Sequence, residues 1–342
     1  NPLQPDTDGD GLKDGNELYG NGTHADLDGL VSSPLMTDTD EDGIPDNEEV
    51  VLGSDGYITD PARSDSDFDG FPDGYEVLHT MNPSDLADLD SDPDADGLPS
   101  YGEMLIGSLP TSSTSPACIY VNSQLGNDVT GDGTAGNPFA TIQKGINSVS
   151  SAPAMVRLAA GEYCENPILR EKVALVGAGS KNTIIDGNGV DRVVDASGIT
   201  NCVIVGLSIR NGYTAGSGAG LNASWTTNGN LYLYDVWMLN NHSSQNGGGL
   251  SVSNGLARVV NSGFQQNTAS KGGGMYCYSV YPCALINCII TDNNSDSGDG
   301  IYVDRCFQGA EVIGCTVANN PGQGIMFNCG WGTLINSLVW NN

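Results

Sequence analysis

The chain has 342 residues, a formal net charge of −30 and nine cysteines. Residues 1 to 103 hold 28 of the 42 acidic residues, but only Lys13 and Arg63 of the basic ones. Such a chain lacks the basic patch that nucleic-acid binding requires, and it contains no apolar run long enough to cross a membrane. We therefore expect no nucleic-acid partner and no membrane span. The length and the uneven charge suggest two domains.

A twelve-residue acidic pattern, DTDGDGLKDGNE at residues 6–17, recurs at 38–49, 65–76 and 92–103. On the numbering of a twelve-residue calcium loop, oxygen-bearing side chains fall on positions 1, 3, 5, 9 and 12. Position 6 is glycine in every copy, where the chain must turn sharply, and position 7 is apolar and offers its backbone carbonyl. A disordered acidic segment would not keep these two features in four copies. The pattern therefore predicts calcium sites.

The predicted metal ligands occupy positions 1, 3, 5, 7, 9 and 12 of each loop, and at least four Ca²⁺ ions are expected. They are Asp6, Asp8, Asp10, Leu12, Asp14 and Glu17; Asp38, Asp40, Asp42, Ile44, Asp46 and Glu49; Asp65, Asp67, Asp69, Phe71, Asp73 and Glu76; and Asp92, Asp94, Asp96, Leu98, Ser100 and Glu103. Acids between the loops are further candidates for sharing extra ions: Asp26, Asp28, Asp60, Asp88 and Asp90.

Only short stretches follow the loops, where an EF-hand would have long helices. After Glu17, Glu49 and Glu76 come LYG, VVLG and VLHT, and the loop starts lie 32, 27 and 27 residues apart. This arrangement resembles the thrombospondin type 3 repeats found in many bacterial surface proteins. The resemblance implies, for residues 1–107, an array with little regular secondary structure that is rigid only when calcium is bound. Loops of modest affinity suit extracellular calcium, so we expect an extracellular or cell-surface location.

A Pro/Ser/Thr-rich linker at 108–117 separates the repeats from a second region, 118–342, with a different periodicity. Glycine clusters are followed by apolar residues at intervals of 29, 25, 26 and 24, and a row of asparagines recurs at intervals of 26, 26, 27 and 22. Short alternating strands precede each asparagine. These periods predict a parallel β-helix with asparagines bonded from coil to coil. The two rows are Leu221, Leu250, Met275, Ile301 and Ile325, and Asn241, Asn267, Asn293, Asn320 and Asn342.

A short helix near 140–149, with Ile142, Ile146 and Val149 at helical spacing, is expected to cover one end of the β-helix. The run TIQKGINSV…VRLAAGEYCENPILREKVALVGAG…TIIDG is similar to the opening of pectin-lyase-like right-handed β-helix proteins. This resemblance implies an all-β, right-handed solenoid for 118–342. It implies no single activity, because the fold hosts lyases, hydrolases, esterases, adhesins and structural coils.

The β-helix shows no legible catalytic or cofactor-binding cluster, so no such residue is predicted and an enzyme is not favoured. Asp296, Asp299 and Asp304 are close in sequence to Arg305, but they lie in a glycine-rich turn, and His242 falls two coils earlier. We interpret these acids as turn residues.

Two groups of cysteines differ in their predicted roles. Cys288 and Cys315 take equivalent inward positions in successive coils, which is typical of buried packing. Cys283, Cys306 and Cys329 follow one another at intervals of 23 residues, close to one coil. Two alternative disulfides are therefore candidates, Cys283–Cys306 and Cys306–Cys329.

The favoured function is that of an extracellular, calcium-stabilised structural or surface protein. Because the chain stops at Asn342 without a capping element, we expect either a fragment of a longer protein or head-to-tail stacking of copies into filaments through the open β-helix end. The alternatives are a secreted polysaccharide lyase or hydrolase and a carbohydrate-binding adhesin. The candidate partners are thus a second copy of the chain and extracellular polysaccharide.

Overall fold

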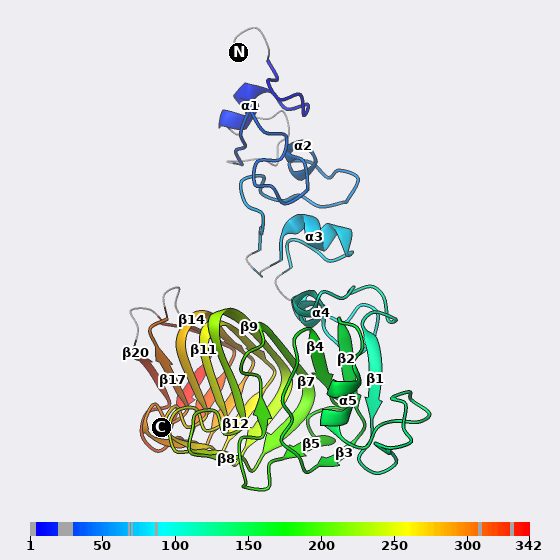
Figure 1. Cartoon of the computed structure of the whole chain (residues 1–342). Helices are drawn as coiled ribbons and strands as arrows, with labels where there is room; N and C mark the ends of the chain where they lie inside the picture. Colours follow the sequence, from blue (N-terminus) through cyan, green and yellow to red (C-terminus); the bar gives the residue numbers. More distant parts are fainter. Residues whose placement is uncertain are drawn as a thin grey trace. The chain divides into compact units, whose positions relative to one another are not determined.

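The structure is a computed structural model that describes residues 5–19, 30–67, 69, 71–85, 88–306, 310–328 and 332–342, without the side chains of 226–228 and 281–282. The chain forms two compact units, Asn1–Asp94 and Ala95–Asn342. Figure 1 shows the elements of each unit. The second unit begins inside the fourth acidic loop and includes the segment 108–117, for which the sequence suggested a linker.

Short helices are the regular elements of the first unit: α1 (Asp14–Tyr19), α2 (Asp46–Glu49), α3 (Asp73–Leu78) and the 3₁₀ helix η1 (Asp88–Asp90). Pro45 and Pro72 cap α2 and α3 in an extended conformation. Proline suits this place because a helix start leaves its N–H groups without intrahelical partners. The predicted array with little regular secondary structure is confirmed.

The second unit is a parallel β-solenoid, as predicted. One row of strands contains β1 (Ala117–Val121), β2 (Ala154–Leu158), β4 (Val173–Val176), the first part of β7 (Asn201–Arg210), the middle of β9 (Leu221–Leu239), the later parts of β11 (Leu250–Val260) and β14 (Met275–Ile286), β18 (Ala310–Ile313) and β21 (Gly332–Ile335).

Two further rows and a small sheet complete the coils. The second row contains β3 (Gly161–Tyr163), β5 (Thr183–Asp186), the ends of β7 and β9, β12 (Gly263–Gln265), β15 (Ile289–Thr291), β19 (Thr316–Ala318) and β22 (Leu338–Trp340). The third contains β6 (Val194–Asp195), the starts of β9, β11 and β14, β17 (Ile301–Asp304) and β20 (Ile325–Asn328). The small sheet contains β8 (Tyr213–Thr214), β10 (His242–Ser243), β13 (Thr268–Lys271) and β16 (Asn294–Ser297).

The apolar residues that follow the glycine clusters pair with one another in neighbouring parallel strands. Leu250 pairs with Leu221 on one side and with Met275 on the other, and Ile301 continues the row to Ile325. Four of these side chains are fully buried in a core that runs along the solenoid. Each coil thus buries its apolar face only by stacking on its neighbours.

The predicted asparagine ladder is also confirmed. The backbone N–H and the Nδ2 of Asn267 both donate to Oδ1 of Asn293, at 3.0 Å each. Asn241 makes the same pair of bonds to Asn267, and Asn293 makes them to Asn320. These amides are buried, and their mutual bonding removes the cost of burying unpaired polar groups.

Two residues in each coil adopt a left-handed backbone conformation on either side of the short second-row strand. In successive coils they are Asp235 and Asn240, Asn261 and Gln266, Asn287 and Asp292, Gly314 and Asn319, and Asn336 and Asn341. Asparagine, aspartate and glycine tolerate this conformation better than most residues do. The second residue of each pair directly precedes the ladder asparagine, so these positions turn the chain at both ends of the strand.

The first left-handed residue interrupts the alternation of buried and exposed side chains. Before it, Leu285 and Val312 are fully buried, while Ile286 and Ile313 are half-buried. Alternating strands with Cys288 and Cys315 inward would also put Ile286 and Ile313 on the inward face. That expectation is wrong, because the corner at Asn287 and Gly314 shifts the alternation by one residue.

Two helices pack on the solenoid. Helix α5 (Ile142–Ser148) lies where a short covering helix was predicted, and Thr141 caps it by accepting from the N–H of Lys144. Its Ile142 and Ile146 are buried in the solenoid core. Helix α4 (Ser100–Ile106) contacts β4, β7 and β9, and its Tyr101 packs edge-to-face on Tyr232.

We predict that Asn293→Ala destabilises the solenoid by about 1–3 kcal/mol, because two buried donors of Asn267 lose their acceptor. Urea unfolding followed by circular dichroism measures the loss. Asn294→Ala is the matched control, since this side chain is the next in the chain and is exposed. Equal stability of the two variants would contradict the structural role of the ladder.

Candidate calcium sites in the acidic repeats

The aspartates of each loop are oriented by the loop's own backbone. In the first loop, the N–H groups of Gly9 and Gly11 donate to Asp6, that of Asp10 donates to Asp8, and that of Leu12 donates to Asp10. The second loop repeats three of these bonds, and the third repeats those from positions 5 and 7. Gly11, Gly43 and Gly97 have φ of +105°, +102° and +87°, so position 6 requires glycine; Gly70 lies outside the described residues.

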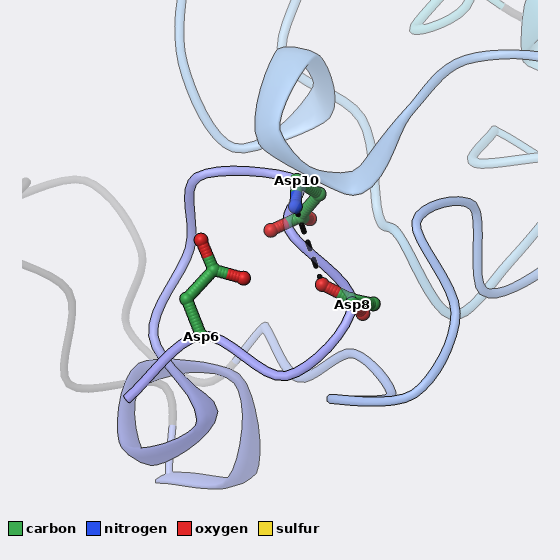
Figure 2. A group of neighbouring side chains, drawn as sticks. All are labelled: Asp6, Asp8 and Asp10. Atoms are coloured by element: carbon green, nitrogen blue, oxygen red, sulfur yellow. Dashed lines mark hydrogen bonds between the residues drawn. The ribbon is translucent and has the colours of Figure 1, made fainter. Parts of the chain in front are cut away.

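This arrangement leaves a second oxygen of several carboxylates pointing at the others. Oxygens of Asp6, Asp8 and Asp10 lie within 4.8 Å of one another, and Figure 2 shows the three groups on the inner side of the loop. The same holds for Asp38, Asp40 and Asp42, and for Asp65, Asp67 and Asp69. Buried oxygens without a hydrogen-bond partner include Asp8 Oδ2, Asp10 Oδ2, Asp38 Oδ1, Asp40 Oδ2, Asp67 Oδ2 and Asp69 Oδ2.

The glutamate at position 12 is carried to its loop by a short helix. Helices α1 to α4 all begin at position 9, so Glu17, Glu49, Glu76 and Glu103 are each the fourth helical residue. All four are buried. Oε2 of Glu17, Oε2 of Glu49 and both carboxylate oxygens of Glu76 lack a hydrogen-bond partner.

Burial and mutual repulsion weaken the acidity of these carboxyls. Desolvation, together with neighbouring aspartates, raises the pKa of Glu17 to about 7 and those of Glu49 and Glu76 to about 9. The same causes raise the pKa of Asp69 to about 7. Buried like charges at such distances require a cation or protons to offset them.

The acid at position 9 closes its own loop by a contact that sequence reasoning missed. In the first loop, the backbone N–H and Oγ1 of Thr7 donate to the two carboxylate oxygens of Asp14, both at 2.8 Å. Thr39 binds Asp46 and Ser66 binds Asp73 in the same way. The signal was present in the sequence, as a hydroxyl residue at position 2 of these three loops.

The same acid also approaches the preceding loop. Oxygens of Asp10, Glu17 and Asp46 lie within 4.8 Å of one another, as do those of Asp42, Glu49 and Asp73. The carboxylate at position 9 of one loop thus lies in a cluster with the carboxylates at positions 5 and 12 of the preceding loop. The N–H of Gly74 also donates to Oδ2 of Asp42 at 2.9 Å, which ties α3 to the second loop.

An acid from outside the motif, Asp88, lies beside the third loop. Asp88, at the start of η1, lies near enough to raise the pKa of Asp69 and of Glu76. One of its oxygens accepts from the N–H of Asn82 at 2.6 Å, and its buried Oδ1 has no hydrogen-bond partner. Asp88 was a candidate for sharing an extra ion. Asp60 instead pairs with Arg63, and Asp26 and Asp28 lie outside the described residues.

The fourth loop departs from the other three. The boundary between the compact units falls within it, after Asp94. In the second unit, Asp96 accepts from the N–H of Leu98, and Glu103 accepts from the hydroxyl of Ser108. Positions 2 and 9 are Pro93 and Ser100, so the donor and the acid of the closing contact are replaced together.

The donor set fits calcium. Every side chain in the clusters offers carboxylate oxygen, the preferred ligand of this hard cation, and several oxygens are buried without hydrogen-bond partners. The apolar side chains of Ile44, Phe71 and Leu98 at position 7 are buried, as expected if only the backbone carbonyl serves the metal. Calcium would neutralise the repulsion and fix the loops.

The acids of the solenoid turns serve the local structure. Asp299 accepts from the N–H and hydroxyl of Ser295 and from the N–H of Gln323, and Asp304 accepts from Asn328. His242 stacks on Tyr213 and bonds to Thr268. A cavity of about 280 Å³ lies elsewhere on the solenoid, lined in part by Tyr120, Asn122 and Arg157.

Comparison with known proteins supports the reading of the acidic segment. Residues 6–23 and 38–55 match the family described as "Bacterial TSP3 repeat", so these stretches belong to the thrombospondin type 3 class predicted from the loops. No curated protein matches the sequence. In the described part of the chain, no helix is long and apolar enough to span a membrane.

Two solved structures are similar to the solenoid at low identity. The pectin methylesterase from Aspergillus niger has a TM-score of 0.35 and 15% identity, with 65% of this chain and 85% of that chain covered. The GH136 lacto-N-biosidase from Eubacterium ramulus has a TM-score of 0.32 and 10% identity, with 65% of each chain covered. Similarity this low supports no inference about activity; the fold assignment rests on the strand pairing itself.

We predict that calcium binding at pH 7 releases protons. Glu49 and Glu76, with pKa values of about 9, are protonated at pH 7 in the metal-free protein, and a bound cation requires their ionised forms. Since folding raises these pKa values above the ordinary 4.5, the metal-free repeats also lose stability as the pH rises toward 9.

A calcium titration in weakly buffered solution, with the released acid counted by back-titration, measures this effect. Glu49→Gln should release fewer protons than the parent protein, whereas Glu48→Gln, at the neighbouring position, should match it. Calcium binding without proton release at pH 7 would show that the buried glutamates are already ionised.

We predict that Asp88→Asn weakens calcium binding at the third loop by about tenfold or more, because it removes a charge beside Asp69 and Glu76. Isothermal titration calorimetry measures the affected site. Asp55→Asn makes the same charge change outside the clusters and serves as the control. Equal affinities in the two variants would exclude Asp88 from the site.

Proposed function

We propose that this protein is an extracellular, calcium-stabilised structural or surface protein. Calcium orders the acidic repeats, and the solenoid provides a rigid stacked element. The single observation that carries the proposal is the set of buried carboxylate oxygens without hydrogen-bond partners in three successive loops. The repeats of residues 6–23 and 38–55 belong to a class of calcium-binding type.

Electrostatics explains why calcium would act as a structural component here. The repeats carry most of a net charge of −30, which disfavours a compact state unless cations offset it. The first unit has few apolar residues to compensate. Its ordering therefore depends on the concentration of calcium, and extracellular concentrations suit loops of modest affinity.

The solenoid's contribution is structural in this proposal. Its polar residues are used largely for coil-to-coil bonding, through the asparagine ladder and the turn acids. Head-to-tail stacking into filaments stays a prediction of the sequence analysis. A polysaccharide lyase or hydrolase and a carbohydrate-binding adhesin are the alternative functions, which glycan arrays and turnover assays on acidic polysaccharides would reveal.

We predict that calcium protects Arg63 from trypsin. Arg63 lies two residues before the start of the third loop, whereas the next basic residue, Lys144, lies in α5 of the solenoid. In millimolar calcium, cleavage after Arg63 should slow by about tenfold or more relative to chelated protein, because cleavage requires the loop to open. Mass spectrometry of the fragments follows each site separately.

Glu76→Gln should make Arg63 susceptible even with calcium, while Asp55→Asn should behave like the parent protein. Electron micrographs of the same samples test assembly: fibres that dissociate on chelation support stacking, and single particles in calcium argue against it. Identical cleavage with and without calcium would refute calcium ordering itself.

A further inference from the structure

Two cysteines face each other inside one coil of the solenoid. The sulfurs of Cys277 and Cys283 are 3.0 Å apart, and both side chains are fully buried. Both lie in β14, on the two sides of a corner where the strand passes from the third row to the first. A disulfide bond needs a sulfur separation of about 2.05 Å, so a small movement would close it.

The neighbouring coils show what these two positions otherwise contain. Cys277 pairs with Val252 and Val303, and Cys283 pairs with Ala257 and Ala310. A valine and an alanine therefore fill the same inward places in the coils on both sides. Of these three coils, only that of β14 has two groups there that can bond to each other.

The backbone at this corner also differs from the coil before it. Gly255 pairs with Val280 and Ala257 pairs with Cys283, so β14 contains one more residue between these points than β11 does. Ser279 has a left-handed φ of 53°. A covalent link from Cys277 to Cys283 would span this longer segment.

We propose that Cys277 and Cys283 form a disulfide that closes this corner. As the chain folds in an oxidising compartment, a small-molecule disulfide oxidises the two thiols. The product is the Cys277–Cys283 bond, and the two hydrogen atoms leave with two equivalents of the reduced small thiol. The pairing differs from Cys283–Cys306 and Cys306–Cys329, which the sequence left open; Cys329 lies outside the described residues.

The other sulfurs near this corner, within the residues that the structure describes, make different contacts. Cys306 donates to the carbonyl of Val280 at 2.8 Å, at the same corner but on the next coil. Cys288 and Cys315 contact each other through the backbone N–H of Cys288, at 3.3 Å from the sulfur of Cys315. They form the inward ladder expected from the sequence, with Ser337 accepting from the N–H of Cys315.

Trypsin separates the competing pairings. The tryptic peptide 272–305 contains Cys277, Cys283 and Cys288, and the peptide 306–342 contains Cys306, Cys315 and Cys329. The full chain would be refolded in a glutathione redox buffer with calcium, denatured, alkylated without reduction, and digested. Refolding in this buffer makes the test independent of the proposed location.

We expect peptide 272–305 to carry one alkyl group, on Cys288, and to be two hydrogen atoms lighter than its reduced form. Three alkyl groups on this peptide would overturn the proposal. A cross-linked pair of the two peptides would overturn it in favour of a Cys283–Cys306 type of bond. Reduction before alkylation should give three alkyl groups in every case.

A double variant, Cys277→Val with Cys283→Ala, copies the residues of the adjacent coils and is therefore expected to fold. Reductant should lower the midpoint of thermal unfolding of the parent protein by several degrees and leave that of the double variant unchanged. The control, Cys288→Ala with Cys315→Ala, should still respond to reductant. A parent protein that does not respond would argue against a stabilising bond.

Discussion

The repulsion between buried carboxylates is the constraint on which the first unit depends. Each loop uses one oxygen of most aspartates to hold its own turn, and the remaining oxygens converge. The backbone alone can arrange such a cluster but cannot neutralise it, because an amide N–H group carries no net charge. The same loop geometry that brings the carboxylates together therefore creates the requirement for a cation.

The acid at position 9 connects the carboxylate cluster of one repeat with the next repeat in the chain. By bonding to its own loop through position 2 while approaching positions 5 and 12 of the preceding loop, it couples neighbouring clusters. A short helix places both this acid and the position-12 glutamate. Ordering of one loop is thereby expected to assist the ordering of its neighbour, as in other linear repeat arrays.

Much of this architecture could be predicted from the sequence, because the relevant patterns recur at nearly regular intervals. The loops, the asparagine ladder and the row through Leu250 are set by spacing alone. Two features were not predictable in this way: the reach of Asp46 to the first loop and the shifted alternation at Ile286. Each depends on how two segments meet or on a single backbone corner, which spacing does not specify.

The paired left-handed residues have a consequence for how the solenoid varies in length. From Val260 to Asn267, from Ile286 to Asn293 and from Ile313 to Asn320, the chain takes seven steps each time. Additional residues instead enter at the corner between the third and first rows, where β9 has three more than β11. Insertions at this corner lengthen one edge of the coil stack, and that edge can acquire new loops while the seven-step segment through the second row stays unchanged.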